Sequence, residues 1–98
     1  MPHLLVFVHN AEMHYVYILK SKRNGRLYTG FSADLRQRVK DHNEGKSAYT
    51  RNNRPYVLVY YEAYASVDDA RKRERGLKLR SNASLQLRRR IQTSINES

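Results

Sequence analysis

The sequence lacks cysteine, is poor in acidic residues and has no long hydrophobic run. Without cysteine, neither disulfide bonds nor thiolate metal sites can form, and this absence leaves the cellular compartment open. The apolar run at residues 4–8 is too short to span a membrane and lacks the cleavage-site pattern of a signal peptide. We therefore expect no association with a membrane.

The charge balance is strongly basic. Nineteen lysines and arginines stand against nine aspartates and glutamates, which gives a formal net charge of +10 over 98 residues. Polyanions such as nucleic acids are the natural partners of such an excess. From charge alone, the alternative is a soluble basic protein associated with the ribosome. The hydrophobic fraction of 40% supports a modest core, and the length fits one domain.

Residues 15–30, YVYILKSKRNGRLYTG, read as a β-hairpin around which the chain is organised. The first five residues are apolar at every position, which is typical of a central strand with both faces covered. Asn24-Gly25 is a pair that favours the positive φ angles of a tight turn. Gly30 has no side chain, so we expect another backbone or a ligand to approach closely there.

The remaining elements follow from capping signals and periodicity. Ser32 or Asp34 can cap a helix that ends near residue 44, before Gly45. A strand at residues 56–61 is rich in valine and tyrosine. Ser66 begins a capping box for a helix to about residue 80, and a third helix follows at about 82–94. This order predicts an α+β fold, in which a small three-stranded antiparallel sheet is flanked by about three helices.

We expect a single domain over residues 13–94. Residues 1–12 read unlike the rest, and Met13 stands directly before the hairpin. We interpret this segment as an appendage outside the native domain; an extra edge strand is the alternative. Residues 95–98 are expected to fray at the end of the chain.

Two polar residues share the apolar stripe of the first helix. Helical spacing places Arg38 and His42 beside Leu35 and Val39, where a simple core helix would have aliphatic side chains. One interpretation is catalytic. The other is that the Arg38 stem covers the core and that His42 caps the helix end.

Glu74 lies in the apolar stripe of the second helix. A carboxylate at such a position is costly unless it is paired or bound to a cation. The sequence leaves two interpretations open, a metal site or a salt bridge. The candidate partners for a salt bridge are Arg38, Arg71, Arg73 and Lys78.

The hairpin motif resembles the signature of the GIY-YIG nuclease domain. Tyr15-Val16-Tyr17, ten further residues and then Tyr28-Thr29-Gly30 stand where that family has its two triplets. Tyr15 replaces a glycine of the family motif, and Thr29 replaces an isoleucine.

The resemblance extends over residues 13–91. Arg38 lies ten positions after Tyr28, where the family has its catalytic arginine, and His42 follows one turn later, as in several members. Glu74, in the stretch ARKRERGLK, stands at the place of the metal-binding glutamate. Asn82 is the nearest candidate for a further asparagine position. The chain is most similar to the small stand-alone bacterial branch that resembles the nuclease domain of the repair excinuclease.

The resemblance implies a metal-dependent endonuclease that hydrolyses DNA phosphodiester bonds, with a cytoplasmic location and a role such as DNA repair. Glu74 would hold one Mg²⁺ or Mn²⁺ ion together with water and substrate oxygens. Arg38 would grip the phosphate through two donors. Tyr28, Tyr17 or His42 would act as the base, directly or as a relay. We assign the attacking water to Tyr28.

A second set of residues is expected to bind nucleic acid outside the catalytic group: Lys46, Arg51, Arg54 and Lys78. Tyr49, in the same loop, could stack on a base or anchor the loop. No zinc finger or helix-turn-helix accompanies the domain, so we expect branched, nicked or flapped DNA, or DNA presented by a protein partner. The alternative function is a non-catalytic nucleic-acid-binding module that uses the same basic surface.

Overall fold

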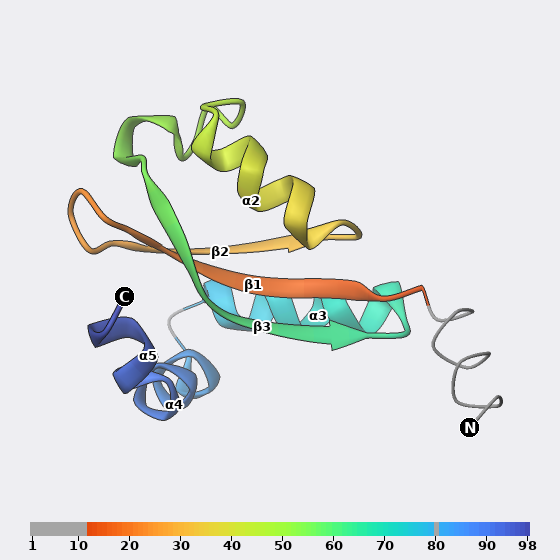
Figure 1. The fold of residues 1–98 in the computed structure, drawn as a ribbon. Helices are drawn as coiled ribbons and strands as arrows, with labels where there is room; N and C mark the ends of the chain where they lie inside the picture. The colour runs from red at the N-terminus through yellow and green to blue at the C-terminus, as the bar shows by residue number, and fades with distance from the viewer. Residues whose placement is uncertain (1–11, 80) are drawn as a thin grey trace, which may run out of the picture.

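The computed structural model describes residues 12–79 and 81–98 (Figure 1). The interpretation of residues 1–12 as an appendage falls almost entirely outside this range and stays a prediction. The elements in chain order are β1 (His14–Ser21), β2 (Leu27–Ser32), α2 (Leu35–Asn43), the 3₁₀ turn η1 (Arg51–Asn53), β3 (Tyr56–Tyr64), α3 (Val67–Lys78), α4 (Asn82–Arg90) and α5 (Gln92–Asn96). The predicted α+β fold with a three-stranded antiparallel sheet is confirmed.

β1 is the central strand, as its uninterrupted apolar run predicts. The strand order is β2-β1-β3, and both pairings are antiparallel. Tyr17 lies opposite Gly30 on β2 and opposite Tyr61 on β3. The register with β3 shifts between Ile18 and Leu19, which marks an irregularity in the middle of the central strand.

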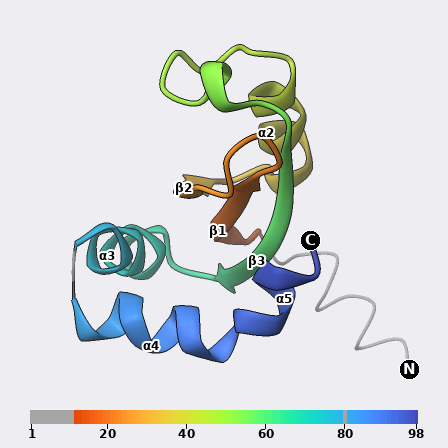
Figure 2. The ribbon, with the colours of Figure 1, turned by 90° about the vertical axis from the view of Figure 1, so that its left-hand side faces the viewer.

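Helices cover both faces of the sheet, with α2 on one face and α3, α4 and α5 on the other (Figures 1 and 2). Successive residues of a strand point to opposite faces, so β1 contributes to two cores. Tyr17 and Leu19 form the smaller core with Tyr56, on the side of α2. The larger core lies against α3 and α4 and consists of Val16, Ile18, Ala70, Leu77, Leu87 and Ile91.

The hairpin turn differs from the expected tight Asn-Gly turn. Gly25 has a φ of 76°, but no non-glycine residue in the described ranges has a positive φ, so Asn24 does not share this conformation. The buried Ser21 hydroxyl instead accepts hydrogen bonds from the backbone N–H groups of Arg23 and Asn24. These bonds stabilise a longer loop between the two strands.

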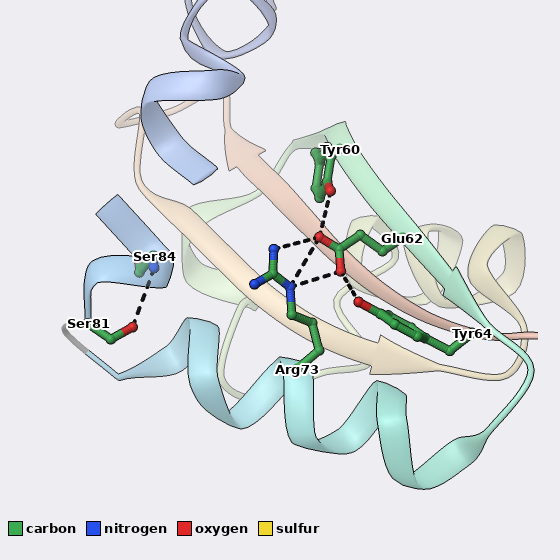
Figure 3. Close-up of polar contacts among 6 residues, drawn as sticks. All are labelled: Tyr60, Glu62, Tyr64, Arg73, Ser81 and Ser84. Carbon is green, nitrogen blue, oxygen red and sulfur yellow. Dashed lines mark hydrogen bonds and ion pairs between the residues drawn. The ribbon is translucent and has the colours of Figure 1, made fainter. Parts of the chain in front are cut away.

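The predicted helix starts are confirmed. Asp34 accepts a hydrogen bond from the backbone N–H of Gln37 and caps α2, and Ser66 caps α3 in the same way. Ser81 caps α4 through the N–H of Ser84, as Figure 3 shows. These caps satisfy backbone donors that have no partner within the helix.

The helix predicted over residues 82–94 is divided in two. Ile91 separates α4 from α5 with φ −105° and ψ 20°, outside the helical range, and is itself buried in the larger core. The described range therefore holds four α-helices where about three were expected. α5 continues to Asn96, and the Lys20 ammonium donates to the carbonyl groups of Ile95 and Ser98 near the expected frayed end.

A partly buried carboxylate, that of Glu62, joins α3 to the edge strand β3 (Figure 3). The Arg73 guanidinium donates to both oxygens of Glu62, at 2.8–3.2 Å, and the hydroxyl groups of Tyr60 and Tyr64 donate to the same carboxylate. Burial acts to raise the pKa of Glu62, but these donors outweigh it, and the pKa lies below its usual value. The cluster fixes α3 at Arg73, the residue that directly precedes Glu74.

Candidate active site

The site begins at the close contact of the two hairpin strands. Tyr17 is only 1% exposed, and its ring lies across Gly30 on the neighbouring strand. A Cβ atom added at Gly30 would lie 2.3 Å from the Tyr17 hydroxyl oxygen, which no side chain could tolerate. The prediction of a close approach at Gly30 is therefore confirmed, and the approaching group is the Tyr17 side chain.

His42 of α2 closes over Tyr17. Its Nε2 lies 2.8 Å from the Tyr17 hydroxyl, and its Nδ1 lies 2.7 Å from the Thr50 hydroxyl. His42 is 1% exposed and Thr50 is equally buried. The ring thus lies inside the smaller core, and the alternative that it caps the helix end is wrong. Burial, and then the charge of Arg38, lower the pKa of His42, so the ring is neutral at pH 7.

The end of α2 is held in place by its last residue. The Asn43 side chain donates to the Tyr56 carbonyl at 3.0 Å and accepts from the Tyr56 backbone N–H at 2.7 Å. These paired hydrogen bonds tie α2 to the start of β3. His42, the neighbouring residue, is thereby kept over the sheet.

Tyr28 and Arg38 are the more open members of the group. Tyr28 is half-buried, with its ring centroid 5.0 Å from that of His42 and 6.3 Å from that of Tyr17. On its other side, the Tyr49 ring lies at 5.7 Å. Arg38 is exposed on α2, and the alternative in which its stem covers the core stays open.

The electrostatics of Tyr17 connect the remaining residues. Burial raises the pKa of Tyr17 well above its ordinary value, and Tyr28 and Glu74 raise it further, while Arg38 lowers it. Tyr17, Tyr28 and His42 pack together. Arg38 on α2 and Glu74 on α3 belong to helices that cover opposite faces of the sheet (Figures 1 and 2), and they are linked to this group through the effect of their charges on Tyr17.

Glu74 is paired with Lys78. The two side chains are 3.1 Å apart at helical i,i+4 spacing, and the Glu74 side chain is 16% exposed. Of the four candidate partners of the salt bridge, Lys78 is the one that makes it, whereas Arg73 binds Glu62. Within the described ranges, no three His, Asp or Glu residues lie close enough together to hold a metal ion by themselves. A divalent ion here would have one protein carboxylate and would take its other ligands from water and phosphate, as Mg²⁺ often does.

Two adjoining hollows open beside this group. Their volumes are about 570 and 510 Å³, and both are lined by Leu27, Tyr28, Tyr49 and Arg88. Tyr17 and His42 line neither hollow. Tyr28 is therefore the tyrosine of the pair that a molecule in these hollows would contact.

The predicted nucleic-acid-binding residues differ in their surroundings. Lys46 makes ion pairs with Asp41 and Glu44, at 3.6 and 3.3 Å. Arg54 is exposed and donates to the Arg51 carbonyl at 2.8 Å, so its guanidinium takes part in the loop structure.

Two further predicted site residues, Lys78 and Asn82, lie on α3 and α4. Lys78 lines the smaller hollow. Asn82 begins α4 and is exposed. None of the described helices combines the length and the apolar character needed to cross a membrane.

Comparison with known proteins places this chain among similar small proteins. The family model described as the GIY-YIG catalytic domain matches residues 13–91. UPF0213 protein SH2523 of Staphylococcus haemolyticus is 48% identical over 66 residues, which cover 66% of this chain and 79% of the relative. UPF0213 protein SERP0126 of Staphylococcus epidermidis is 47% identical over 68 residues, 68% of this chain and 82% of the relative. The solution NMR structure of UPF0213 protein BH0048 from Bacillus halodurans is 38% identical, covers 76% of this chain and 80% of its own, and has a TM-score of 0.48.

Proposed function

The chain belongs to the GIY-YIG catalytic domain family, and on this premise we propose that it is a divalent-metal-dependent endonuclease that hydrolyses DNA phosphodiester bonds. The observation that carries the proposal is the hydrogen bond between the Tyr17 hydroxyl and His42 Nε2, beside the Tyr28 ring, with the charges of Arg38 and Glu74 acting on the same hydroxyl. Phosphodiester hydrolysis needs an activated water, neutralised phosphoryl charge and a stabilised leaving oxygen. The group contains side chains suited to each of these tasks.

Tyr28 is the residue we assign to the attacking water. It lines both hollows, whereas Tyr17 and His42 are enclosed. Burial raises the pKa of Tyr17, which makes its hydroxyl a poor base, and favours the neutral His42 ring. We therefore assign Tyr17 and His42 to positioning and proton relay. In this assignment, Thr50 fixes the ring orientation of His42 through Nδ1.

Arg38 is assigned to the phosphate. It is exposed on α2, and its charge lowers the pKa of both Tyr17 and His42. A guanidinium keeps its charge at all relevant pH values and offers two parallel donors to phosphate oxygens. Preorganised donors of this kind stabilise charge as it develops in the transition state.

Glu74 would hold one divalent ion, Mg²⁺ or Mn²⁺, when the site is loaded. Such an ion would stabilise the leaving oxygen as a Lewis acid. The Lys78 ammonium forms an ion pair with the Glu74 carboxylate, and this ion pair would have to break before the carboxylate could bind a metal ion. Lys78 lines the smaller hollow, so a substrate phosphate is available as its next partner.

The proposed substrate is DNA, held largely by charge. A net charge of +10 supports binding without sequence preference, and the affinity should fall steeply with salt. We propose branched, nicked or flapped DNA, or DNA presented by a protein partner, in a cytoplasmic process such as repair. These finer assignments rest on the family and on the basic surface.

Cleavage of labelled oligonucleotides tests the proposal. The wild-type protein should cut DNA with Mg²⁺ or Mn²⁺ and should not cut it with a chelator. Arg38→Gln should reduce cleavage by about 10²–10³-fold, the loss typical of one transition-state donor. Arg36→Gln is the matched control, since Arg36 is exposed on the same helix but lines a hollow elsewhere, and it should cut like the wild type.

One observation favours the alternative, a non-catalytic nucleic-acid-binding module. The carboxylate assigned to the metal already has an ammonium partner, Lys78. Salt-sensitive DNA binding without cleavage at any tested concentration of Mg²⁺ or Mn²⁺ would favour this alternative over the nuclease.

A further inference from the structure

The two hollows beside Tyr28 share four lining residues, and we name them together the Tyr49–Arg88 groove after two of these four. We propose that this groove receives an unpaired nucleotide of the substrate, with its base stacked on Tyr49 and its phosphate held by Arg88. The inference rests on the proposed function in that the ligand is a nucleic acid. It adds the form of nucleic acid that the site accepts.

Tyr49 has the properties of a stacking platform. Its side chain is 83% exposed, the most exposed of the described large hydrophobic residues that lie on the surface. The ring nevertheless has a neighbour, because its centroid lies 5.7 Å from that of Tyr28. Tyr28 supports the ring, and most of the Tyr49 surface stays open to a ligand. At this exposure, anchoring of the loop is a minor role for the side chain.

Arg88 supplies positive charge to the groove. It projects from α4, is exposed and makes no ion pair with any residue of the described ranges. The larger hollow also has Arg26 in its wall, and the smaller one has Lys78. No described acidic residue lines either hollow. A cationic wall without carboxylates is suited to a phosphate backbone.

The size of the groove favours an unpaired nucleotide over a duplex. Each hollow, at about 510–570 Å³, matches the pockets that enclose single small molecules. A base can stack on an aromatic ring only after it has left its neighbour in the helix. Tyr28 lines both hollows, so a nucleotide stacked on Tyr49 would bring its adjoining phosphate to the tyrosine assigned to the attacking water.

Equilibrium binding with a chelator present tests the proposal without cleavage. The probes are a fluorescent 20-nucleotide single strand, its duplex, and a single strand that carries 2-aminopurine, whose fluorescence is quenched when it stacks. Tyr49→Ala should weaken single-strand binding by about 5- to 150-fold and remove the quenching, whereas Tyr49→Trp should retain both. Duplex binding should change little. Arg88→Gln should weaken single-strand binding and lower the salt slope of log K by about 0.7.

Two control variants match the test variants. Tyr61→Ala removes an exposed tyrosine that lines a different hollow, and Arg90→Gln removes one charge from the same helix about 200° away from Arg88. Tyr61→Ala should leave binding and quenching unchanged. Arg90→Gln should cause a smaller loss of affinity than Arg88→Gln.

The outcomes separate this inference from the proposed nuclease function. If Tyr49→Ala binds the single strand and quenches 2-aminopurine like the wild type while the protein cuts DNA, the groove does not bind a nucleotide, but the proposed nuclease function is supported. If the quenching depends on Tyr49 but no metal supports cleavage, the groove binds a nucleotide as proposed, but the protein is not a nuclease. Equal loss of duplex and single-strand affinity in Tyr49→Ala would also overturn the groove. Absence of binding to every probe would overturn the groove, and the cleavage assay would then decide on the nuclease by itself.

Discussion

The Tyr17 hydroxyl lies 2.8 Å from Nε2 of His42, and each of the two side chains is 1% exposed. This contact joins the central strand to α2 across 25 positions of sequence. Thr50 extends it on the far side of the ring. A polar chain inside an apolar core is costly unless every member is bonded, so the three groups stabilise one arrangement of strand, helix and loop.

The first prediction concerns the pH dependence of stability. The pKa of His42 lies below its ordinary value because burial, and then Arg38, disfavour the charged ring. The unfolded chain therefore binds the His42 proton more readily than the folded protein. The stabilising effect is complete above the unfolded pKa of about 6.5 and is lost as the pH falls towards the folded pKa. The slope from this residue should approach about 1.4 kcal/mol per pH unit at most.

Denaturant unfolding between pH 5 and 8 measures this effect. His42→Gln is the comparison variant, because a neutral amide can bond Tyr17 but cannot titrate. Its free energy of unfolding should change less than that of the wild type below pH 6.5. Parallel curves for the two proteins would show that His42 is not the group that titrates.

The second prediction concerns the strand contact at Gly30. Gly30→Ala places a methyl group 2.3 Å from the Tyr17 hydroxyl oxygen, so the Tyr17 ring or the β2 strand must move. Overpacking of this kind typically costs about 1–3 kcal/mol. The Tyr17–His42 hydrogen bond should be disturbed, and cleavage should fall as well. Thermal unfolding and cleavage rates, measured on the same preparation, check both effects.

Gly76→Ala is the matched control for that variant. A Cβ atom at this helical glycine would meet nothing within 4 Å. Alanine lowers the entropy cost of a helix, so stability should rise by about 0.5–1 kcal/mol. A loss at Gly76 as large as that at Gly30 would mean that the close contact with Tyr17 is not the cause.

Much of the fold could be predicted because local chemistry determines it. The apolar run of β1 predicted a central strand, and side-chain oxygens before α2 and α3 predicted their starts. The break at Ile91 could not be predicted, since neither glycine nor proline stands there. The conformation of Asn24 could not be predicted either. Its backbone N–H donates to the Ser21 hydroxyl, which is buried only in the folded protein.

The site could be predicted less completely than the fold. Spacing and family resemblance selected Tyr17, His42 and Glu74; the structure joins Tyr17 to His42 by a hydrogen bond and pairs Glu74 with Lys78. Thr50 was missed, because a threonine in a polar loop gives no sign that it will be buried against a histidine eight positions earlier. Arg88 is one of three consecutive arginines, and only the packing of α4 singles it out from its neighbours.

The third prediction separates two roles of Glu74. Glu74 forms an ion pair with Lys78, whose side chain is 50% exposed, so solvent weakens the interaction. Glu74→Gln should therefore cost at most about 0.5 kcal/mol of stability. As a metal ligand, the same residue is essential, and metal-dependent cleavage should disappear. DNA binding should persist or tighten, because a negative charge near phosphate has been removed. Melting temperature, affinity and cleavage are measured on the one variant.

Lys78→Met is the control for the ion pair. It removes the same pair but leaves a largely buried carboxylate without its cation, so it should be less stable than Glu74→Gln. Metal-dependent cleavage should remain, with a higher KM, because Lys78 lines the smaller hollow. Equal loss of cleavage in both variants would indicate that the pair itself, and not a bound metal, is what the site needs.

The last prediction tests the two hairpin tyrosines against each other. Tyr28→Phe removes a hydroxyl from a half-buried ring that keeps its packing against His42 and Tyr49. Folding and DNA affinity should stay near wild type, while cleavage should fall by about 10²–10⁴-fold, as for the loss of a positioned acid–base group. Tyr49→Phe keeps the ring surface and should change little.

Tyr17→Phe should give the opposite balance. It deprives the buried His42 Nε2 of its partner, so it should cost about 1–3 kcal/mol of stability and reduce cleavage less than Tyr28→Phe does. Thermal unfolding and single-turnover cleavage of both variants, with saturating metal, make the comparison. A Tyr28→Phe protein that cuts as fast as its parent would remove Tyr28 from the chemistry. His42, which is bonded to the Tyr17 hydroxyl, would then be left as the candidate base.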